Sequence, residues 1–229
     1  MSNCNTPEHR STRRIMPIAC GTALAVVALT VSLAQSAYAG EIVVPSVPDN
    51  IDINILEPGN VAYLVGHGVG TQNYICSKSG TGVKYVLFTP QATLFDDDDK
   101  QIITHYFSPN LNPITSDPNT NPAVVADGAI RVTWQHKDTS TIWAKLHVDP
   151  IKGNGSATVD QNSVAWLLLD VVGTEVGPTG GDKLTQTTFV QRLNTEGGLQ
   201  PSTGCNSLDD LGNQAFIPYE ADYFFYTKK

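Results

Sequence analysis

Short apolar or alternating runs, separated by turn residues, fill most of this 229-residue chain after its first 60 residues. Val, Ile, Thr, Tyr and Trp are plentiful in them, and no long stretch has helical periodicity. We predict strands over 61–65, 71–77, 83–89, 101–107, 129–136, 141–148, 164–172, 185–193 and 215–226. This spacing points to a sandwich or a closed barrel instead of βαβ units, and we predict an all-β, single-domain β-sandwich that is jelly-roll-like.

The predicted β domain spans 61–229 and follows an extended leader over 40–60, where prolines block a long helix. The acidic run 96–99 lies between two predicted strands and predicts a charged hairpin turn. The segment 108–126 holds four prolines and is long for a hairpin connection. It predicts a mobile insertion or, alternatively, a lid or binding loop.

The first 39 residues have the pattern of a secretory signal peptide. Arg10, Arg13 and Arg14 precede an apolar run over 18–33, and the small-residue site Ala37-Tyr38-Ala39 follows it. We expect cleavage after Ala39 and a secreted or periplasmic location. A membrane anchor is the alternative, but the site directly after the run, with no second long apolar run, favours cleavage and no stable membrane span in the mature chain.

The charge balance argues against nucleic acid as a partner. The chain has 14 Lys and Arg and 22 Asp and Glu, and cleavage removes three Arg and Glu8. The remaining 11 basic and 21 acidic residues give the mature chain a net charge of about −10. Such a charge opposes binding to nucleic acid and to anionic membranes.

Two cysteines remain in the mature chain, Cys76 and Cys205. In an oxidising compartment we expect them to form one disulfide that closes a loop of about 130 residues. The alternative is two separate thiols, one of them a nucleophile. No Cys-x-x-Cys spacing supports redox catalysis.

Four histidines remain after cleavage: His67, His105, His136 and His147. None of them has the spacing of a helical zinc motif, so we predict no metal site and no cofactor. The sequence also lacks the Gly-x-Ser-x-Gly elbow that would indicate a nucleophilic triad. His105, near the end of a predicted strand, is the candidate base for an acid–base reaction.

Polar residues inside apolar strands are the other candidates for a site. Arg192 follows a β-like run, and Asp222 interrupts the last strand. They form a structural ion pair in one interpretation; in the other, Arg192 presents its guanidinium to a carboxylate or to sugar hydroxyls. An exposed Trp or Tyr can stack on a sugar ring. We therefore name as candidate ligand-binding residues His105, Tyr106, Trp134, Arg192 and Asp222.

Several patches together resemble the DUF3455 family, a group of exported proteins without an assigned function. They are 70–76 (GTQNYIC), 105–106 (HY), 166–169 (WLLL), 190–198 (VQRLNTEGG) and 218–226 (PYEADYFFY). The resemblance covers roughly 60–226 and implies export and a compact β-rich domain, with both cysteines in or near the patches. Where many relatives have His-Tyr-x-Gly-Pro-x-Trp, this chain has His105-Tyr106-Phe107-Ser108-Pro109 and lacks that Gly and Trp.

The function that we predict is a non-catalytic binding or structural module of the cell envelope or extracellular space. A carbohydrate or another cell-surface component is the candidate ligand. The alternative is a secreted hydrolase, metal-assisted or not, that uses His105 with a nearby acid. The sequence leaves the ligand and the oligomeric state open.

Overall fold

The computed structural model describes residues 42–110, 114 and 130–229. The predicted signal peptide over 1–39 lies outside the described residues, and so does most of the predicted loop over 108–126. No helix in the described part of the chain is long and apolar enough to cross a membrane.

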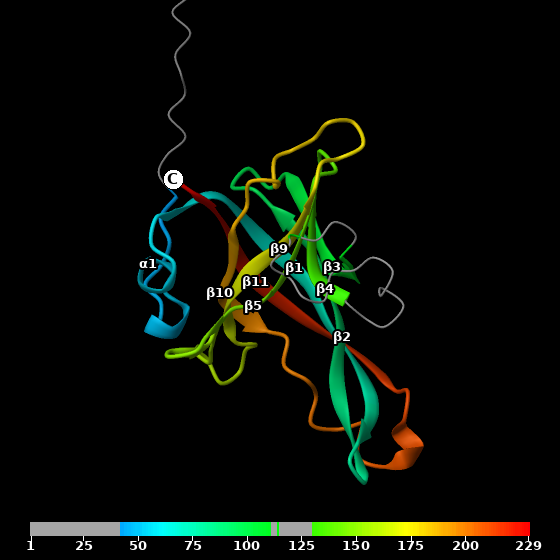
Figure 1. Ribbon diagram of the computed structural model, residues 1–229. Helices are drawn as coiled ribbons and strands as arrows, with labels where there is room; N and C mark the ends of the chain where they lie inside the picture. Colours follow the sequence, from blue (N-terminus) through cyan, green and yellow to red (C-terminus); the bar gives the residue numbers. More distant parts are fainter. Residues whose placement is uncertain (1–41, 111–113, 115–129) are drawn as a thin grey trace, which may run out of the picture. The chain divides into compact units, whose positions relative to one another are not determined.

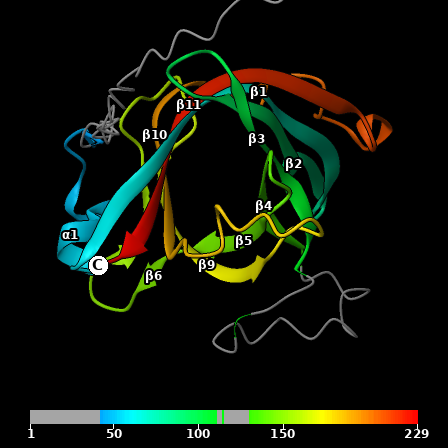
Figure 2. The ribbon, with the colours of Figure 1, turned by 90° about the horizontal axis from the view of Figure 1, so that it is seen from above.

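Eight long antiparallel strands form a closed barrel (Figures 1 and 2). Each of them pairs with the next long strand along the chain, and the last pairs with the first. The strands are β1 (Asn60–Ser79), β2 (Gly82–Phe95), β3 (Gln101–Pro109), β4 (Ile130–His136), β5 (Thr141–Leu146), β9 (Trp166–Glu175), β10 (Phe189–Gly197) and β11 (Gln214–Lys228).

The all-β class and the single disulfide are confirmed, but the sandwich or jelly-roll arrangement is not. A sandwich consists of two sheets packed face to face. Here the hydrogen-bonded ladder continues around the ring, through β9–β10 and β11–β1, and leaves one sheet closed on itself. Side chains that alternate along each strand therefore point either into the barrel or to its outside.

Strand β1 is longer than predicted, because the segment between two predicted strands is itself extended. Gly68 and Gly70 lie in it at inward positions. A Cβ atom on Gly68 would come within 2.9 Å of the Tyr223 ring, and one on Gly70 within 2.6 Å of the Ala92 Cα atom. Glycine here serves close packing inside the barrel and does not end the strand.

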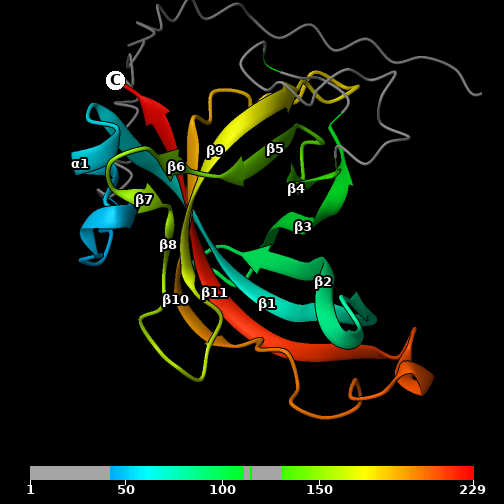
Figure 3. The same ribbon diagram turned by 60° about the horizontal axis from the view of Figure 1, so that its bottom comes forward.

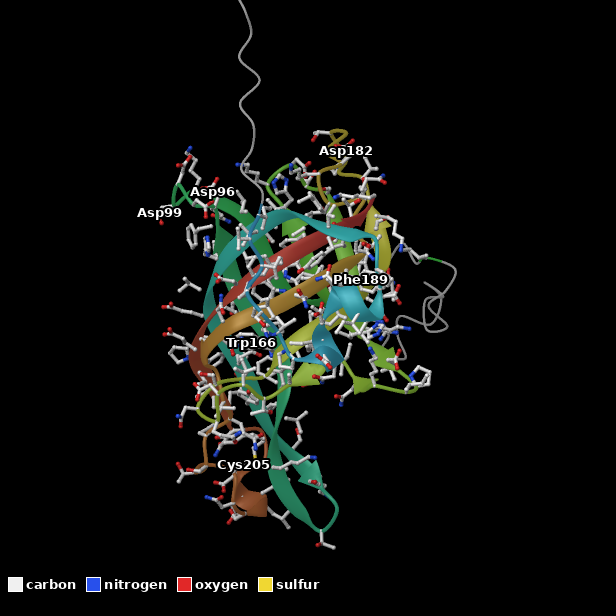
Figure 4. The ribbon with its side chains drawn as sticks, turned by 90° about the vertical axis from the view of Figure 1, so that its left-hand side faces the viewer. Asp96, Asp99, Trp166, Asp182, Phe189 and Cys205 are labelled. Atoms are coloured by element: carbon white, nitrogen blue, oxygen red, sulfur yellow. A yellow bond between two sulfur atoms is a disulfide. The ribbon has the colours of Figure 1, made fainter. Side chains whose placement is uncertain are left out.

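The predicted turn over 96–99 joins β2 to β3. The Asp96 carboxylate accepts hydrogen bonds from the backbone N–H groups of Asp98 (3.1 Å) and Lys100 (2.9 Å). Figure 4 labels Asp96 and Asp99 at this turn. An aspartate that bonds the backbone two residues on is a standard way to close a turn, so the acidic run is a hairpin connection.

The predicted leader holds two short helices, η1 (Asp49–Ile51) and α1 (Ile53–Leu56). Asp52 starts α1 by accepting a hydrogen bond from the Asn54 backbone N–H. Ile51 and Ile53 are buried against the outer side of the barrel, in a cluster that includes Phe224 and Tyr226. Figure 4 labels Phe189 and Trp166, which pack against the same cluster.

Strands β1, β2 and β11 continue beyond the ring as a three-stranded arm (Figure 3). The Cys76–Cys205 disulfide lies in this arm and ties β1 to the segment between β10 and β11. The same segment contains the short helix η3 (Leu208–Asp210). The bridge thus fixes a long connection against the end of the barrel.

The connection from β5 to β9 contains three two-residue strands. Strands β6 (Val148–Asp149) and β7 (Gly153–Asn154) pair with each other, and β8 (Ser156–Ala157) pairs with the start of β9. Residues 158–165 then lead into β9.

Candidate functional site

The barrel encloses a cavity of about 450 Å³. Its apolar lining includes Leu87, Phe107, Val132, Leu167, Leu169 and Leu199, and its polar lining includes Gln72, Tyr74, Ser163, His105, Arg192 and Tyr223. Most of these residues occupy inward positions of barrel strands, while Ser163 and Leu199 come from the connections before β9 and after β10. The rest of the interior is filled by large apolar side chains, among them Leu94, Ile103, Ile142, Val190 and Phe225.

Stacked rings form one wall of the cavity. His105 lies on Trp134 with ring centroids 4.6 Å apart and planes at 14°. Tyr223 meets both rings at steeper angles, with centroid distances of 5.1 Å and 5.9 Å. Trp134 is fully buried and His105 is 3% exposed, so this wall is held rigidly by packing.

His105 is a neutral imidazole at physiological pH. Burial lowers its pKa to about 3; a hydrogen bond to the Thr133 carbonyl opposes this shift, and the positive charge of Arg192 adds to it. The ring Nδ1 lies 2.9 Å from the Thr133 carbonyl oxygen. Because a carbonyl only accepts, Nδ1 carries the proton and Nε2 is left as an acceptor.

Arg192 brings the positive charge of the site. It lies on β10 opposite Tyr223 of β11 and Leu167 of β9. Its Nε and Nη2 atoms donate to the Ala165 carbonyl oxygen at 3.2 Å and 2.7 Å. This anchors the guanidinium beside the segment that enters β9.

The ion pair between Arg192 and Asp222 that one interpretation of the sequence offered is absent. Asp222 follows the inward-facing Ala221 and precedes the inward-facing Tyr223, so its side chain lies on the outside of the barrel. There its carboxylate bonds His67 Nδ1 at 2.7 Å and Asn194 Nδ2 at 2.8 Å. In the described part of the chain, Arg192 forms no ion pair with any carboxylate.

Of the five candidate residues, the cavity brings together His105, Trp134 and Arg192. Tyr106, the neighbour of His105, lies instead at a more open groove on the outer face, beside Thr104 and Gln135. Tyr106 and Asp222 are each one position away from a lining residue. In a strand that single step moves a side chain to the other face.

Among the described residues, two buried nitrogens of the lining have no hydrogen-bond partner of good geometry: Gln72 Nε2 and Trp134 Nε1. Gln72 does lie near enough to the Tyr219 hydroxyl to oppose the rise that burial gives the pKa of that phenol. Gln72 is only 1% exposed. Buried polar groups are nearly always paired, and an exception calls for water or a ligand. Sequence reasoning did not place Gln72 and Tyr223 in the site; their inward positions, in step with Gly68, Gly70 and Ala221, are the signal that could have found them.

The other three histidines among the described residues pair with aspartates. His67 bonds Asp222 and Asp97, His136 Nδ1 lies 3.0 Å from Asp138, and His147 Nδ1 lies 2.7 Å from Asp170. Within 42–110, 114 and 130–229, no three His, Cys, Asp or Glu side chains are grouped as metal ligands would be. His67 lies on β1, His136 at the end of β4 and His147 after β5, and each bonds different aspartates, so they do not form a common site.

Comparison with known proteins gives a match to a protein-family model. A family model described as "Protein of unknown function (DUF3455)" matches residues 57–227. Searches among curated proteins and among solved structures give no match. The match covers the eight long strands of the barrel, apart from the last residue of β11, and the residues of the cavity.

Proposed function

The chain belongs to the DUF3455 family, whose description names no activity, and we propose that it is an exported protein that binds one small molecule inside its barrel. Export is supported by the basic, apolar and small-residue pattern of 1–39. Binding is supported by the interior of the barrel. The proposed role is non-catalytic.

The cavity itself carries this proposal. Eight-stranded barrels either fill their interior with side chains or hold one small ligand. A volume of about 450 Å³ lies in the range of small-molecule sites. It would hold about 15 waters at liquid density, so the ligand has on the order of 15 non-hydrogen atoms. The Gln72 Nε2 and Trp134 Nε1 atoms are two buried donors in its walls that a ligand could bond.

The lining favours an apolar ligand over the carbohydrate predicted from the aromatic residues. A sugar needs a hydrogen-bond partner for each hydroxyl group, and leaving such groups unpaired is expensive. Leu87, Phe107 and Leu199 offer it none. The stacked pair of His105 and Trp134 gives a flat apolar surface that suits an alkyl chain or an aromatic ring equally well.

The hydrolase alternative receives less support from the same residues. A catalytic histidine needs a group that orients it and an acid or nucleophile within hydrogen-bond reach. His105 Nδ1 bonds a backbone carbonyl, and the described lining residues include no Asp or Glu. Its low pKa also makes it a poor base near neutral pH.

The proposal is tested with N-phenyl-1-naphthylamine, a neutral apolar dye whose fluorescence rises in apolar surroundings. We expect saturable binding of one dye per mature chain. Leu87→Trp places a large ring in the cavity and should weaken binding at least tenfold. Val86→Trp is the matched control, because Val86 is the adjacent residue and is 40% exposed.

The control should bind the dye as the natural chain does, and both variants should keep the far-ultraviolet circular dichroism of the parent. Absence of saturable dye binding would refute an internal site. Equal binding by the Leu87→Trp and Val86→Trp variants would place the dye elsewhere and would refute it as well.

A further inference from the structure

Arg192 is the one charged residue among the described residues that line the cavity, apart from His105, which is neutral. Its guanidinium is fixed to the Ala165 carbonyl by two hydrogen bonds. Those bonds use two of its five N–H groups. In the portion of the chain described, no carboxylate pairs with it, although the chain as a whole is acidic.

The guanidinium lies among neutral aromatic groups. Burial raises the pKa values of Tyr74 and Tyr223, and Arg192 opposes the rise for both. Both phenols are therefore uncharged at neutral pH and cannot serve as its counter-ion. His105 carries no charge there either. Arg192 itself is half-buried, and a cation that is partly shielded from water gains from an anion that binds beside it.

We infer that the ligand of this site is an amphipathic anion, a small organic acid whose carboxylate binds Arg192 and whose apolar part fills the cavity against Trp134 and the leucines. The inference rests on the proposed function, because it needs the cavity to be a binding site. It goes further by naming the chemical class of the ligand.

The two parts of such a molecule match two parts of the cavity. Leu167 is the partner of Arg192 in the β9–β10 ladder, and Leu169, which also lines the cavity, lies two residues further along β9. An acid bound at the guanidinium thus has apolar wall directly beside its head group. Arginine favours a carboxylate over an alcohol of equal length, because its planar fork donates charge-assisted bonds.

Three ten-carbon compounds test the inference by displacing N-phenyl-1-naphthylamine: decanoate, decanol and decylamine. They share an apolar chain and differ in head group. We expect decanoate to bind at least tenfold more tightly than decanol, and decylamine more weakly than either. Arg192→Met should lower decanoate affinity at least tenfold and leave decanol within about twofold.

Lys84→Met is the control for the loss of one positive charge, since Lys84 is exposed and lies on the arm. It should leave all three affinities unchanged. Retained decanol binding by the Arg192→Met variant shows that this variant is folded. Equal binding of decanoate and decanol, or an Arg192→Met variant that still prefers decanoate, would overturn the inference and leave the proposed function standing. Failure of the dye itself to bind would overturn both.

Discussion

At the scale of single residues, His105 shows how packing sets chemistry. It is buried between Trp134 and Tyr223, and its Nδ1 atom bonds a backbone carbonyl. The cost of burying an imidazolium outweighs that hydrogen bond, so the pKa falls to about 3. The residue acts as a flat neutral wall of the cavity.

This shift predicts a loss of stability in acid. The unfolded chain takes up a proton at His105 below about pH 6.5, while the folded chain stays unprotonated until about pH 3. The contribution of His105 is therefore present above pH 6.5 and is lost as the pH falls towards 3. Between pH 6 and 4, the free energy of unfolding should fall about 1.4 kcal/mol per pH unit more steeply in the natural chain than in His105→Phe. Urea unfolding at several pH values measures both slopes.

His67 provides the contrasting control. Its pKa is raised mainly by the hydrogen bond to Asp97 and further by Asp222, while burial acts in the opposite direction. Its contribution is present below the unfolded pKa and is lost as the pH rises through the folded one. His67→Gln should therefore lose stability only at the acid end, and little, because the side chain is 45% exposed.

For His105, parallel slopes of the free energy of unfolding against pH in the natural chain and in His105→Phe would contradict a buried neutral imidazole.

At the scale of elements, β1 shows what the sequence could not reveal. Its alternation is interrupted by Gly66, Gly68 and Gly70, and glycine weakens the strand signal. The residues that explain these glycines are not their neighbours in the sequence: Ala92 meets Gly70 across the β1–β2 ladder, and Tyr223 meets Gly68 only where β11 pairs with β1 to close the barrel. Local pattern therefore predicted the strands on either side and missed their continuity.

For the candidate site, too, the sequence predicted which residues are unusual but not which face of a strand they occupy. Polar or aromatic side chains in apolar strands pointed to His105, Trp134 and Arg192, and all three line the cavity. The face on which Tyr106 and Asp222 lie depends on register, which a single sequence does not specify. The sequence also could not predict that the barrel closes, because strands of a sandwich and strands of a barrel share the same two-residue alternation.

Gly70→Ala tests the close packing of β1. The new Cβ atom would lie 2.1 Å from the Gln91 carbonyl oxygen, which belongs to the backbone and cannot rotate away. We expect a loss of about 1–3 kcal/mol in the free energy of unfolding, measured by urea denaturation. Gly82→Ala is the control, since its Cβ atom would have no neighbour closer than 3.9 Å, and it should change stability by less than about 0.5 kcal/mol. Equal stabilities of the two variants would refute the packing argument.

The disulfide predicts an effect on both stability and binding. Cys76 and Cys205 are 129 residues apart, so the bridge restricts the unfolded chain by about 5 kcal/mol in the chain-entropy model. Gly198 and Leu199 lie just before the bridged segment; Gly198 accepts a hydrogen bond from Tyr74 at 2.6 Å, and Leu199 lines the cavity. The double variant Cys76→Ser with Cys205→Ser should unfold at lower urea and bind the dye more weakly. Dye affinity unchanged in a folded double variant would show that the bridge does not position this segment.

At the scale of the whole molecule, the negative net charge of the chain contrasts with the single positive charge in the lining of the cavity. The chain carries a net charge of −8, about −10 after the predicted cleavage, while the lining of the cavity carries one cation and no carboxylate among the described residues. Surface repulsion acts on every anion that approaches, while Arg192 attracts any anion that reaches it. An amphipathic acid gains in addition from burying its apolar part, so the proposed site should bind it more tightly than a simple inorganic anion.

Protein purified from the compartment to which we propose that it is exported allows export, the disulfide and the bound ligand to be tested together by mass spectrometry. We expect the mass of the denatured protein to be that of a chain that begins at Gly40. It should also be about 2 Da below the mass of the reduced chain, because one S–S bond replaces two S–H groups. Under native conditions the mass should be higher by that of one bound organic acid, lost on denaturation. The Arg192→Met protein, prepared in the same way, should retain the first two properties and lose the bound acid. A chain that keeps residues 1–39 would favour the membrane anchor over a cleaved signal, and an added mass retained by the Arg192→Met protein would show that the guanidinium does not select the ligand.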